Sequence, residues 1–169
     1  IRCGMIFMSY SVAHVINAWE SVYYLQNEVA FGVIVRGMHH WGASLVIVMM
    51  FLHMLRVFFQ GAYKKPRELN WVVGVLIFFV MLGLGFTGYL LPWDMKALFA
   101  TKVGLQIAEA VPFLGPAIKT LLAGDATIIG AQTLTRFFAI HVFFLPAALL
   151  GLLAAHFIMI RRQGISGPL

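Results

Sequence analysis

Three long apolar stretches, at residues 34–59, 71–91 and 137–160, dominate the pattern of hydrophobic and polar positions along this chain. An α-helix needs about 20 apolar residues to cross a bilayer core of roughly 30 Å, and each stretch meets that length. A fourth apolar stretch at the start of the chain is about half as long. Because the chain opens on Ile1 rather than on methionine, we expect this first helix to be incomplete, with residues missing before it.

The pattern therefore predicts an all-α membrane protein, a four-helix transmembrane bundle within a single domain covering residues 1–169. We place helix A at about 1–12, helix B at about 34–59, helix C at about 71–91 and helix D at about 136–160. Residues 13–33 form a connection whose aromatic side chains suit a membrane interface.

Residues 95–135 are apolar but are interrupted by prolines and glycines, so no part of them is long enough to span. Two short helices, at about 98–108 and 115–122, would explain this stretch if they lie along the membrane surface. Such a layer either roofs a cavity for a lipid-soluble substrate or simply connects helices C and D.

Composition and charge support a membrane protein and orient it. The 169 residues are 62% hydrophobic and 11% charged, with a mean hydropathy of +0.91. The net charge of +6 is concentrated in the loop after helix B and at the end of helix D. By the positive-inside rule these ends face the cytoplasm or its equivalent, here called the n side, and the opposite face is the p side. We interpret the basic excess as topology and attraction to lipid, not as nucleic-acid binding. The single cysteine, Cys3, excludes an internal disulfide.

Four histidines lie within the predicted spanning helices: His39 and His53 in helix B, and His141 and His156 in helix D. At about 100° and 1.5 Å per residue, a separation of 14 places two side chains about 40° and 21 Å apart, and a separation of 15 gives about 60° and 22 Å. Helices B and D run in the same direction, so His39 pairs with His141 on the p side and His53 pairs with His156 on the n side.

Two separate bis-imidazole sites suit haem iron, whereas zinc or copper requires ligands clustered around one point. Hydrogen bonding between helices and a proton path are the alternatives for membrane histidines. Gly74 and Gly88 in helix C are also 14 residues apart, which would leave room for two flat macrocycles at the same two depths. Arg36 and Arg56 stand three residues outside His39 and His53, where a cation could meet a cofactor carboxylate or simply snorkel to the interface.

A set of motifs resembles the cytochrome b family of quinol-oxidising complexes over essentially the whole chain. The spacing of 15 on helix D, Pro-Trp-Asp and the Gly-Pro-Leu ending are similar to the split cytochrome b6 type. The motifs are Arg36-x-x-His39-x-x-x-Ala43-Ser44, His53-x-x-Arg56, Lys64-Lys65-Pro66-Arg67-Glu68, Gly88-Tyr89-x-Leu91-Pro92-Trp93-Asp94, Thr133-Leu134-Thr135-Arg136-Phe137 and Ile165-Ser166-Gly167-Pro168-Leu169.

The resemblance implies two non-covalent haems b. His39 and His141 would ligate a low-potential p-side haem, and His53 and His156 a high-potential n-side haem. It further implies that three arginines lie near haem propionates and that three glycines give the rings clearance. These residues are Arg36, Arg56 and Arg136, and Gly4, Gly74 and Gly88.

The resemblance also implies a function. Quinol would be oxidised on the p side near Trp93, Asp94, Phe99, Lys102 and Val103. One electron would pass to an iron-sulfur protein and the other through both haems to a quinone on the n side, with protons released on the p side and taken up on the n side. The location would be an energy-transducing membrane, either a bacterial plasma membrane or a thylakoid.

The partners implied are a Rieske iron-sulfur protein, a c-type cytochrome and a dimeric complex. The Pro-Glu-Trp-Tyr motif of the p-side quinol site is absent, so we expect a subunit IV-like partner to complete that site and expect no quinol oxidation by this chain alone. A third haem, haem c, would need a cysteine upstream of Ile1, because Cys3 falls too late in helix A. The alternative function is a dihaem membrane anchor that passes electrons between quinone and a peripheral dehydrogenase or hydrogenase; a transporter or non-haem scaffold is a third.

Overall fold

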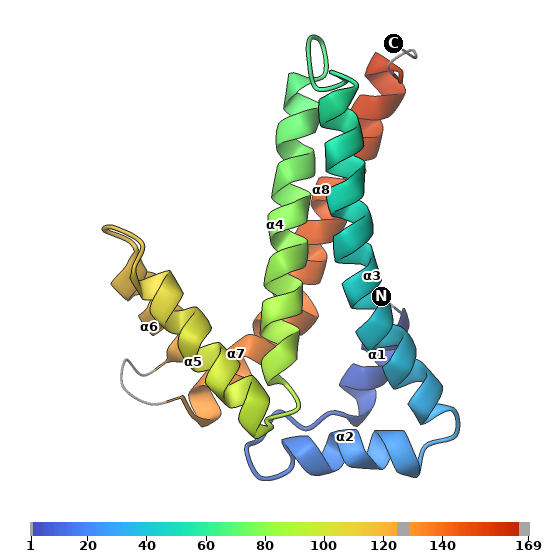
Figure 1. Cartoon of the computed structure of the whole chain (residues 1–169). Helices are drawn as coiled ribbons and strands as arrows, with labels where there is room; N and C mark the ends of the chain where they lie inside the picture. Colours follow the sequence, from blue (N-terminus) through green and yellow to red (C-terminus); the bar gives the residue numbers. More distant parts are fainter. Residues whose placement is uncertain (1, 125–128, 166–169) are drawn as a thin grey trace.

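A computed structural model describes residues 2–124 and 129–165, and every regular element within them is helical (Figure 1). This confirms the predicted all-α class. Ile1 and residues 166–169, which carry most of the family-like ending, lie outside the described residues. The elements are α1 (Arg2–Tyr10), α2 (Ala18–Asn27), α3 (Gly32–Phe59), α4 (Glu68–Leu90), α5 (Met95–Glu109), α6 (Gly115–Ala123), α7 (Ala131–Ala139), the π-helical turn η1 (Ile140–Phe144) and α8 (Leu145–Gln163).

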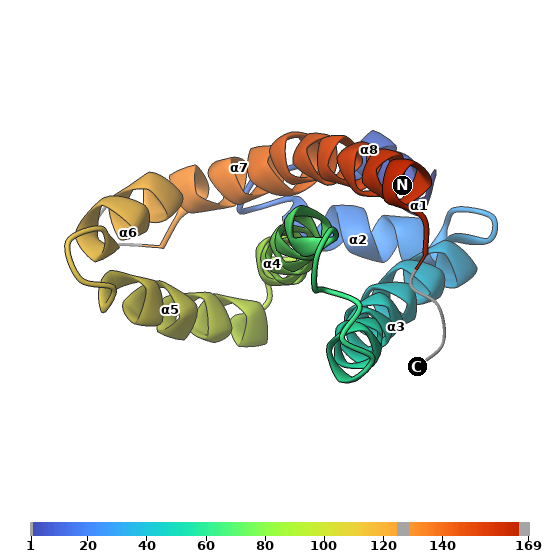
Figure 2. The same ribbon diagram turned by 90° about the horizontal axis from the view of Figure 1, so that it is seen from above.

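Three helices are long and apolar enough to cross a membrane: α3, α4 and the continuous run from α7 through η1 to α8. Almost none of their side chains is buried inside the chain, which suits helices that are covered by lipid or by partner subunits. Seen along the helices, α4 lies between α3 and α8, and it packs against both (Figure 2). The described part of α1 has 9 residues and packs on α2 and α3. It is too short to span, as predicted for the incomplete helix A, and three helices of the described residues are long enough.

The two ends of the bundle differ. The helix α2 lies across one end, where α5 starts and from which α5 and α6 slant away beside the bundle, and the loop at residues 60–67 lies at the other end with the end of α8 (Figure 1). At that second end Arg67 donates from Nε to the Gly164 carbonyl at 3.2 Å and from Nη2 to the Ile165 carbonyl at 3.0 Å. The basic loop and the end of α8 are therefore joined on the predicted n side, which leaves α2 and the start of α5 on the predicted p side.

The connection predicted at residues 13–33 contains a helix, α2, which sequence reasoning missed. Its buried residues Ala18, Val22 and Leu25 recur at the spacing of one helical face, so the signal was present in the sequence. The chain then turns sharply into α3. A Cβ at Gly32 would lie far inside contact distance of the Leu25 backbone carbonyl, so only glycine fits this position.

The tightest packing is in the p-side layer, where α4, α5, α6 and α7 meet. The buried cluster consists of Leu90, Ala97, Leu105, Ala123 and Phe137. The helices α5 and α6 are too short to span a membrane but are apolar. Their apolar residues cover the end of α4 and the start of α7. The two predicted short helices are thus confirmed as α5 and α6, and their apolar residues form part of a core. Their position on the p-side surface stays a prediction.

Candidate functional site

The p-side histidine pair is brought together. His39 comes from α3 and His141 from the π turn η1, and their ring centres lie 6.3 Å apart with the ring planes at 86°. A metal ion bound by two imidazole nitrogens at about 2 Å each would separate the ring centres by roughly 6 Å. The spacing of this pair therefore fits an iron held between the two rings, as a bis-histidine haem requires.

The second ring nitrogen of His141 is also engaged. His141 Nδ1 lies 3.2 Å from Thr87 Oγ1, and Thr87 is buried. The Thr87 hydroxyl has one proton, which it donates to the Gly83 carbonyl at 2.8 Å, so it accepts the Nδ1–H of His141. This tautomer leaves Nε2 with its lone pair available to a metal. Thr87 was missed by sequence reasoning, although it adjoins the predicted Gly88.

The two glycines of α4 lie against histidine rings. A Cβ built on Gly88 would come 2.5 Å from His141 Cε1, and one on Gly74 would come 3.6 Å from His156 Cε1. These glycines therefore let α4 approach the imidazoles closely, a use the sequence had not indicated. Gly4 on α1 has nothing within 4 Å of the position of a Cβ, which is compatible with its predicted role of leaving room for a flat ring.

The π turn explains how the interval of 15 residues in one helix can match the interval of 14 in the other. A π turn holds one residue more than the α-helical turn it replaces, and η1 is closed by the Leu145 N–H donating to the Ile140 carbonyl. The 15 residues between His141 and His156 thus turn through about the same angle as the 14 between His39 and His53. Pro146 accounts for the turn, because its ring would clash with the carbonyl of Val142 in a regular helix.

The n-side histidine pair is arranged differently. His156 Nδ1 is buried and makes no hydrogen bond within the described residues, whereas His53 is exposed on α3. Among the described residues, no three His, Cys, Asp or Glu side chains cluster as a conventional metal site would require. The His39–His141 pair thus offers a two-ligand site, and this donor set fits haem iron.

The three predicted propionate arginines have separate surroundings. Arg36 lines a small pocket of about 240 Å³ together with Gln26 and His40, and Arg56 is exposed near the end of α3. Arg136 instead donates from Nη1 to the carbonyls of Thr120 at 3.1 Å and Leu121 at 2.6 Å. Its guanidinium therefore satisfies the last turn of α6, where helix carbonyls have no partner of their own.

The neighbouring positions of the motif that contains Arg136 are also structural. Thr133 and Leu134 of the same motif are almost fully buried, as is Phe137. The Thr133 hydroxyl donates to the Ala123 carbonyl at 2.6 Å and accepts from the Gly130 N–H at 3.2 Å. The Thr-Leu-Thr-Arg-Phe motif thus fastens the start of α7 to α6.

The five residues predicted near a quinol site divide into two groups. Trp93 takes a left-handed conformation, with φ of 57°, and packs on the p-side cluster. Asp94 begins α5 by accepting a hydrogen bond from the Ala97 N–H at 2.8 Å. Phe99, Lys102 and Val103 are exposed on α5. The structure does not gather all five around one cavity within the described residues.

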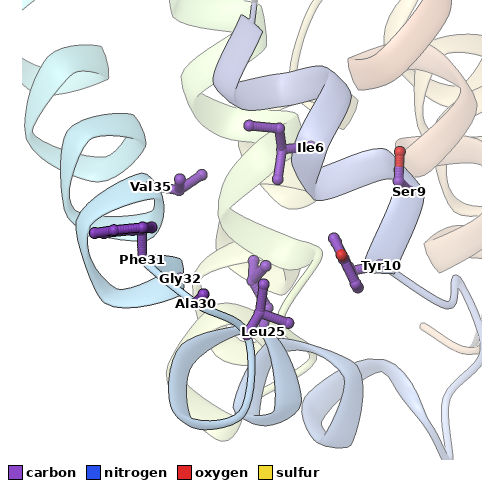
Figure 3. Close-up of a pocket in the computed structure, with 9 residues that line it drawn as sticks. Ile6, Ser9, Tyr10, Leu25, Ala30, Phe31, Gly32 and Val35 are labelled. Atoms are coloured by element: carbon purple, nitrogen blue, oxygen red, sulfur yellow. The ribbon is translucent and has the colours of Figure 1, made fainter.

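A larger pocket lies elsewhere. It has a volume of about 690 Å³ and lies between α1, α2 and the start of α3 (Figure 3). Its lining is mainly apolar, with the side chains of Ser9 and Tyr10 as polar exceptions; the other lining residues are Ile6, Leu25, Val29, Ala30, Phe31, Gly32 and Val35. None of the predicted site residues lines it. Sequence patterns could not indicate it, because three separate elements form its walls.

Comparison with known proteins gives close relatives. Residues 1–164 match the family described as cytochrome b/b6/petB. The chain is 85% identical over 169 residues to the menaquinol:cytochrome c reductase cytochrome b subunit of Geobacillus thermodenitrificans, covering 100% of this chain and 75% of that one. It is 49% identical over 152 residues to the cytochrome b6 of Heliobacterium modesticaldum, covering 90% of this chain and 71% of that one.

A solved structure described as a hyperthermophilic respiratory Complex III has the same fold. It matches with a TM-score of 0.89 and 34% sequence identity over 98% of this chain, and the chain spans 45% of that solved chain. Together with the three membrane-length helices, these relatives place the chain among integral membrane proteins of energy-transducing membranes. The family predicted from the motifs is confirmed: this chain belongs to the cytochrome b/b6 family.

Proposed function

We propose that this chain is the dihaem cytochrome b subunit of a quinol:cytochrome c oxidoreductase complex of the bc or b6f type. The observation that carries the proposal is the His39–His141 pair, with its rings 6.3 Å apart inside a spanning bundle. The relative from Geobacillus thermodenitrificans is a menaquinol:cytochrome c reductase subunit, which supports menaquinol as the quinol.

When bound, haem supplies a one-electron carrier at each of the two depths. His39 and His141 would hold the p-side iron, and His53 and His156 the n-side iron. The apolar spanning helices exclude water from both sites. Arg36 and Arg56 remain available near the two ends of α3 for carboxylates, because neither guanidinium makes a hydrogen bond within the described part of the chain.

Quinol oxidation would take place at the p end, where two electrons and two protons leave each quinol. One electron would go to a Rieske iron-sulfur protein, and the other would travel through this chain to a quinone at the n end. Moving an electron inward against about 100 mV costs about 2.3 kcal/mol. The carrier at the p end must therefore have the lower potential.

The exposed face of α5 supports a shared quinol site. Phe99, Lys102 and Val103 point away from the buried residues Ala97, Thr101 and Leu105 of the same helix. We propose that a subunit IV-like partner covers this face, with a c-type cytochrome subunit completing a dimeric complex. On this view the isolated chain binds haem but does not oxidise quinol.

The test is a His39→Ala substitution in the purified complex, with His40→Ala as the matched control. His40 is the adjacent residue and is exposed on α3. H39A should lose one of two b haems and its quinol:cytochrome c reductase activity, while H40A keeps both haems. Two fully bound b haems in H39A would refute the proposed ligand. If the complex were instead a dihaem anchor without quinol bifurcation, the wild-type complex would contain both b haems. It would show no oxidant-induced reduction of haem b.

A further inference from the structure

Thr87 is hydrogen-bonded to His141 but is not one of the four proposed haem ligands. We propose that Thr87 is a positioning residue that fixes His141 for the p-side haem and keeps the potential of that haem low. The inference rests on the proposed function, because it presumes iron between His39 and His141.

The geometry around Thr87 lets its hydroxyl act toward the His141 ring only as a hydrogen-bond acceptor. Thr87 is 4% exposed, so water cannot replace its partners. Its proton is directed to the Gly83 carbonyl at 2.8 Å, one helical turn earlier, and its oxygen faces His141 Nδ1 at 3.2 Å. The hydroxyl therefore acts as an acceptor for the ring and selects the tautomer with a free Nε2.

Neighbouring residues hold the ring in place. Gly88 permits the approach, because a Cβ there would overlap the imidazole. His141 also belongs to the π turn η1, whose position in the helix is fixed by Pro146. Thr87 is the only side chain of α4 that hydrogen-bonds a histidine within the described residues. The ring also lies against the Leu84 backbone, so Thr87 supplies its one side-chain hydrogen bond from α4 among the described residues.

The chemical consequence concerns the metal bond. An outer hydrogen bond from the Nδ1–H of a ligand histidine raises the basicity of the ligating nitrogen. A more basic axial ligand favours the more highly charged ferric iron and so lowers the reduction potential. Thr87 therefore shifts the p-side haem in the direction that electron transfer toward the n side requires.

The n-side pair lacks an equivalent side-chain contact, although His156 lies against the Asn70 backbone of α4 much as His141 lies against that of Leu84. His156 Nδ1 has no hydrogen-bond partner among the described residues, although Gly74 approaches its ring as Gly88 approaches that of His141. Position 73, which corresponds to Thr87 by the interval of 14, is Val73. The two sites therefore differ by one hydroxyl at matching places on α4. This difference gives the two haems different potentials.

The test is a redox titration of haem b in the purified complex carrying Thr87→Val, with Thr87→Ser as the conservative variant. Valine keeps the shape and removes the hydroxyl, and serine keeps the hydroxyl. Thr120→Val is the matched control. Like Thr87, Thr120 donates to the carbonyl four residues earlier, that of Pro116 at 2.9 Å, but its hydroxyl bonds no histidine. A pyridine haemochrome count accompanies each titration.

We expect T87V to raise the midpoint potential of the p-side haem alone, T87S to restore it, and T120V to change neither potential. Selective loss of the p-side haem in T87V, with recovery in T87S, also supports positioning. The inference is overturned if T87V binds both haems at unchanged potentials, or if T87S behaves like T87V. Absence of b haem from the unmodified complex would instead be a failure of the proposed function.

Discussion

At the scale of single residues, the site depends on close contacts between α4 and the histidines of the last spanning helix. Gly88 and Gly74 occupy matching positions, but the space at each differs by about an ångström: 2.5 Å to His141 against 3.6 Å to His156. A separation of 3.6 Å is ordinary van der Waals contact, whereas 2.5 Å requires the ring to move. The same substitution should therefore have unequal effects at the two depths.

Gly88→Ala should weaken the p-side site, and Gly74→Ala should be tolerated. Overpacking costs about 1–3 kcal/mol, so G88A should lower p-side haem affinity by roughly tenfold or more. Haem content and separate redox titration of the two haems in each purified variant provide the measurement. Equal retention of the p-side haem in G88A and G74A would show that His141 is not held against α4.

Arg136→Met tests whether Arg136 serves the fold or a haem carboxylate. Its observed hydrogen bonds go to the Thr120 and Leu121 carbonyls. Losing charged hydrogen bonds costs about 1.5–3 kcal/mol, and partial exposure of the side chain places the expected cost near the lower end. We expect a lower thermal midpoint for the complex and faster proteolysis near α6. A changed p-side haem potential with unchanged stability would instead support the propionate role implied by the family resemblance.

At the scale of elements, the π turn makes two unequal sequence intervals structurally equivalent. In uninterrupted helices, intervals of 14 and 15 residues differ by about 100° of rotation, and the sequence prediction treated helix D as uninterrupted. The observed helix carries one extra residue in η1, directly at His141. The turn therefore keeps His141 and His156 on one face.

Deletion of Phe143 tests this equivalence, with deletion of Leu45 from α3 as the matched control. Both residues are exposed and apolar and lie between two predicted ligands. Without Phe143 the π turn becomes an α-helical turn and the interval becomes 14, so both b haems should bind. Without Leu45 the interval in α3 falls to 13, one ligand rotates by about 100°, and a haem should be lost. Haem loss from both deletion variants would argue against the turn as the compensating device.

The sequence was informative where hydrophobic periodicity and histidine spacing were strong. Spans, the short helices α5 and α6 and the family could be predicted, because each is encoded in a long segment or in several motifs. The contacts of Thr87 and the capping by Arg136 could not be, since they join elements far apart in the chain. The helix α2 was missed because its aromatic residues suggested an interfacial connection, although Ala18, Val22 and Leu25 follow a helical spacing.

At the scale of the whole molecule, packing is concentrated at the p end and the spanning helices remain open. The buried cluster joins α4 to α5, α6 and α7, whereas the membrane-length helices bury few side chains within the chain. The p-side layer thus fixes the positions of α4 and α7 relative to each other. Helix α4 carries Gly88, and α7 continues directly into the π turn that carries His141. Lipid, cofactor and partner subunits are left to cover the rest.

Single-cysteine labelling tests the orientation of this layer. In a Cys3→Ser background, Lys65→Cys should react with a membrane-impermeant thiol reagent only from the n side, and Phe113→Cys only from the p side. Both positions are exposed, Phe113 fully so at 102% relative accessibility; Lys65 lies in the loop before α4 and Phe113 in the turn between α5 and α6. Labelling of both cysteines from the same side of sealed vesicles would contradict the topology.

The central claim is that two histidine pairs of this chain hold two haems b at different depths and potentials. It is tested most directly by a dithionite-reduced minus oxidised spectrum of the purified complex, combined with a redox titration and a pyridine haemochrome count per copy of this polypeptide. The account predicts two non-covalent b haems that titrate as separate one-electron components. Fewer than two b haems would contradict it and would return the unmatched histidines to helix packing.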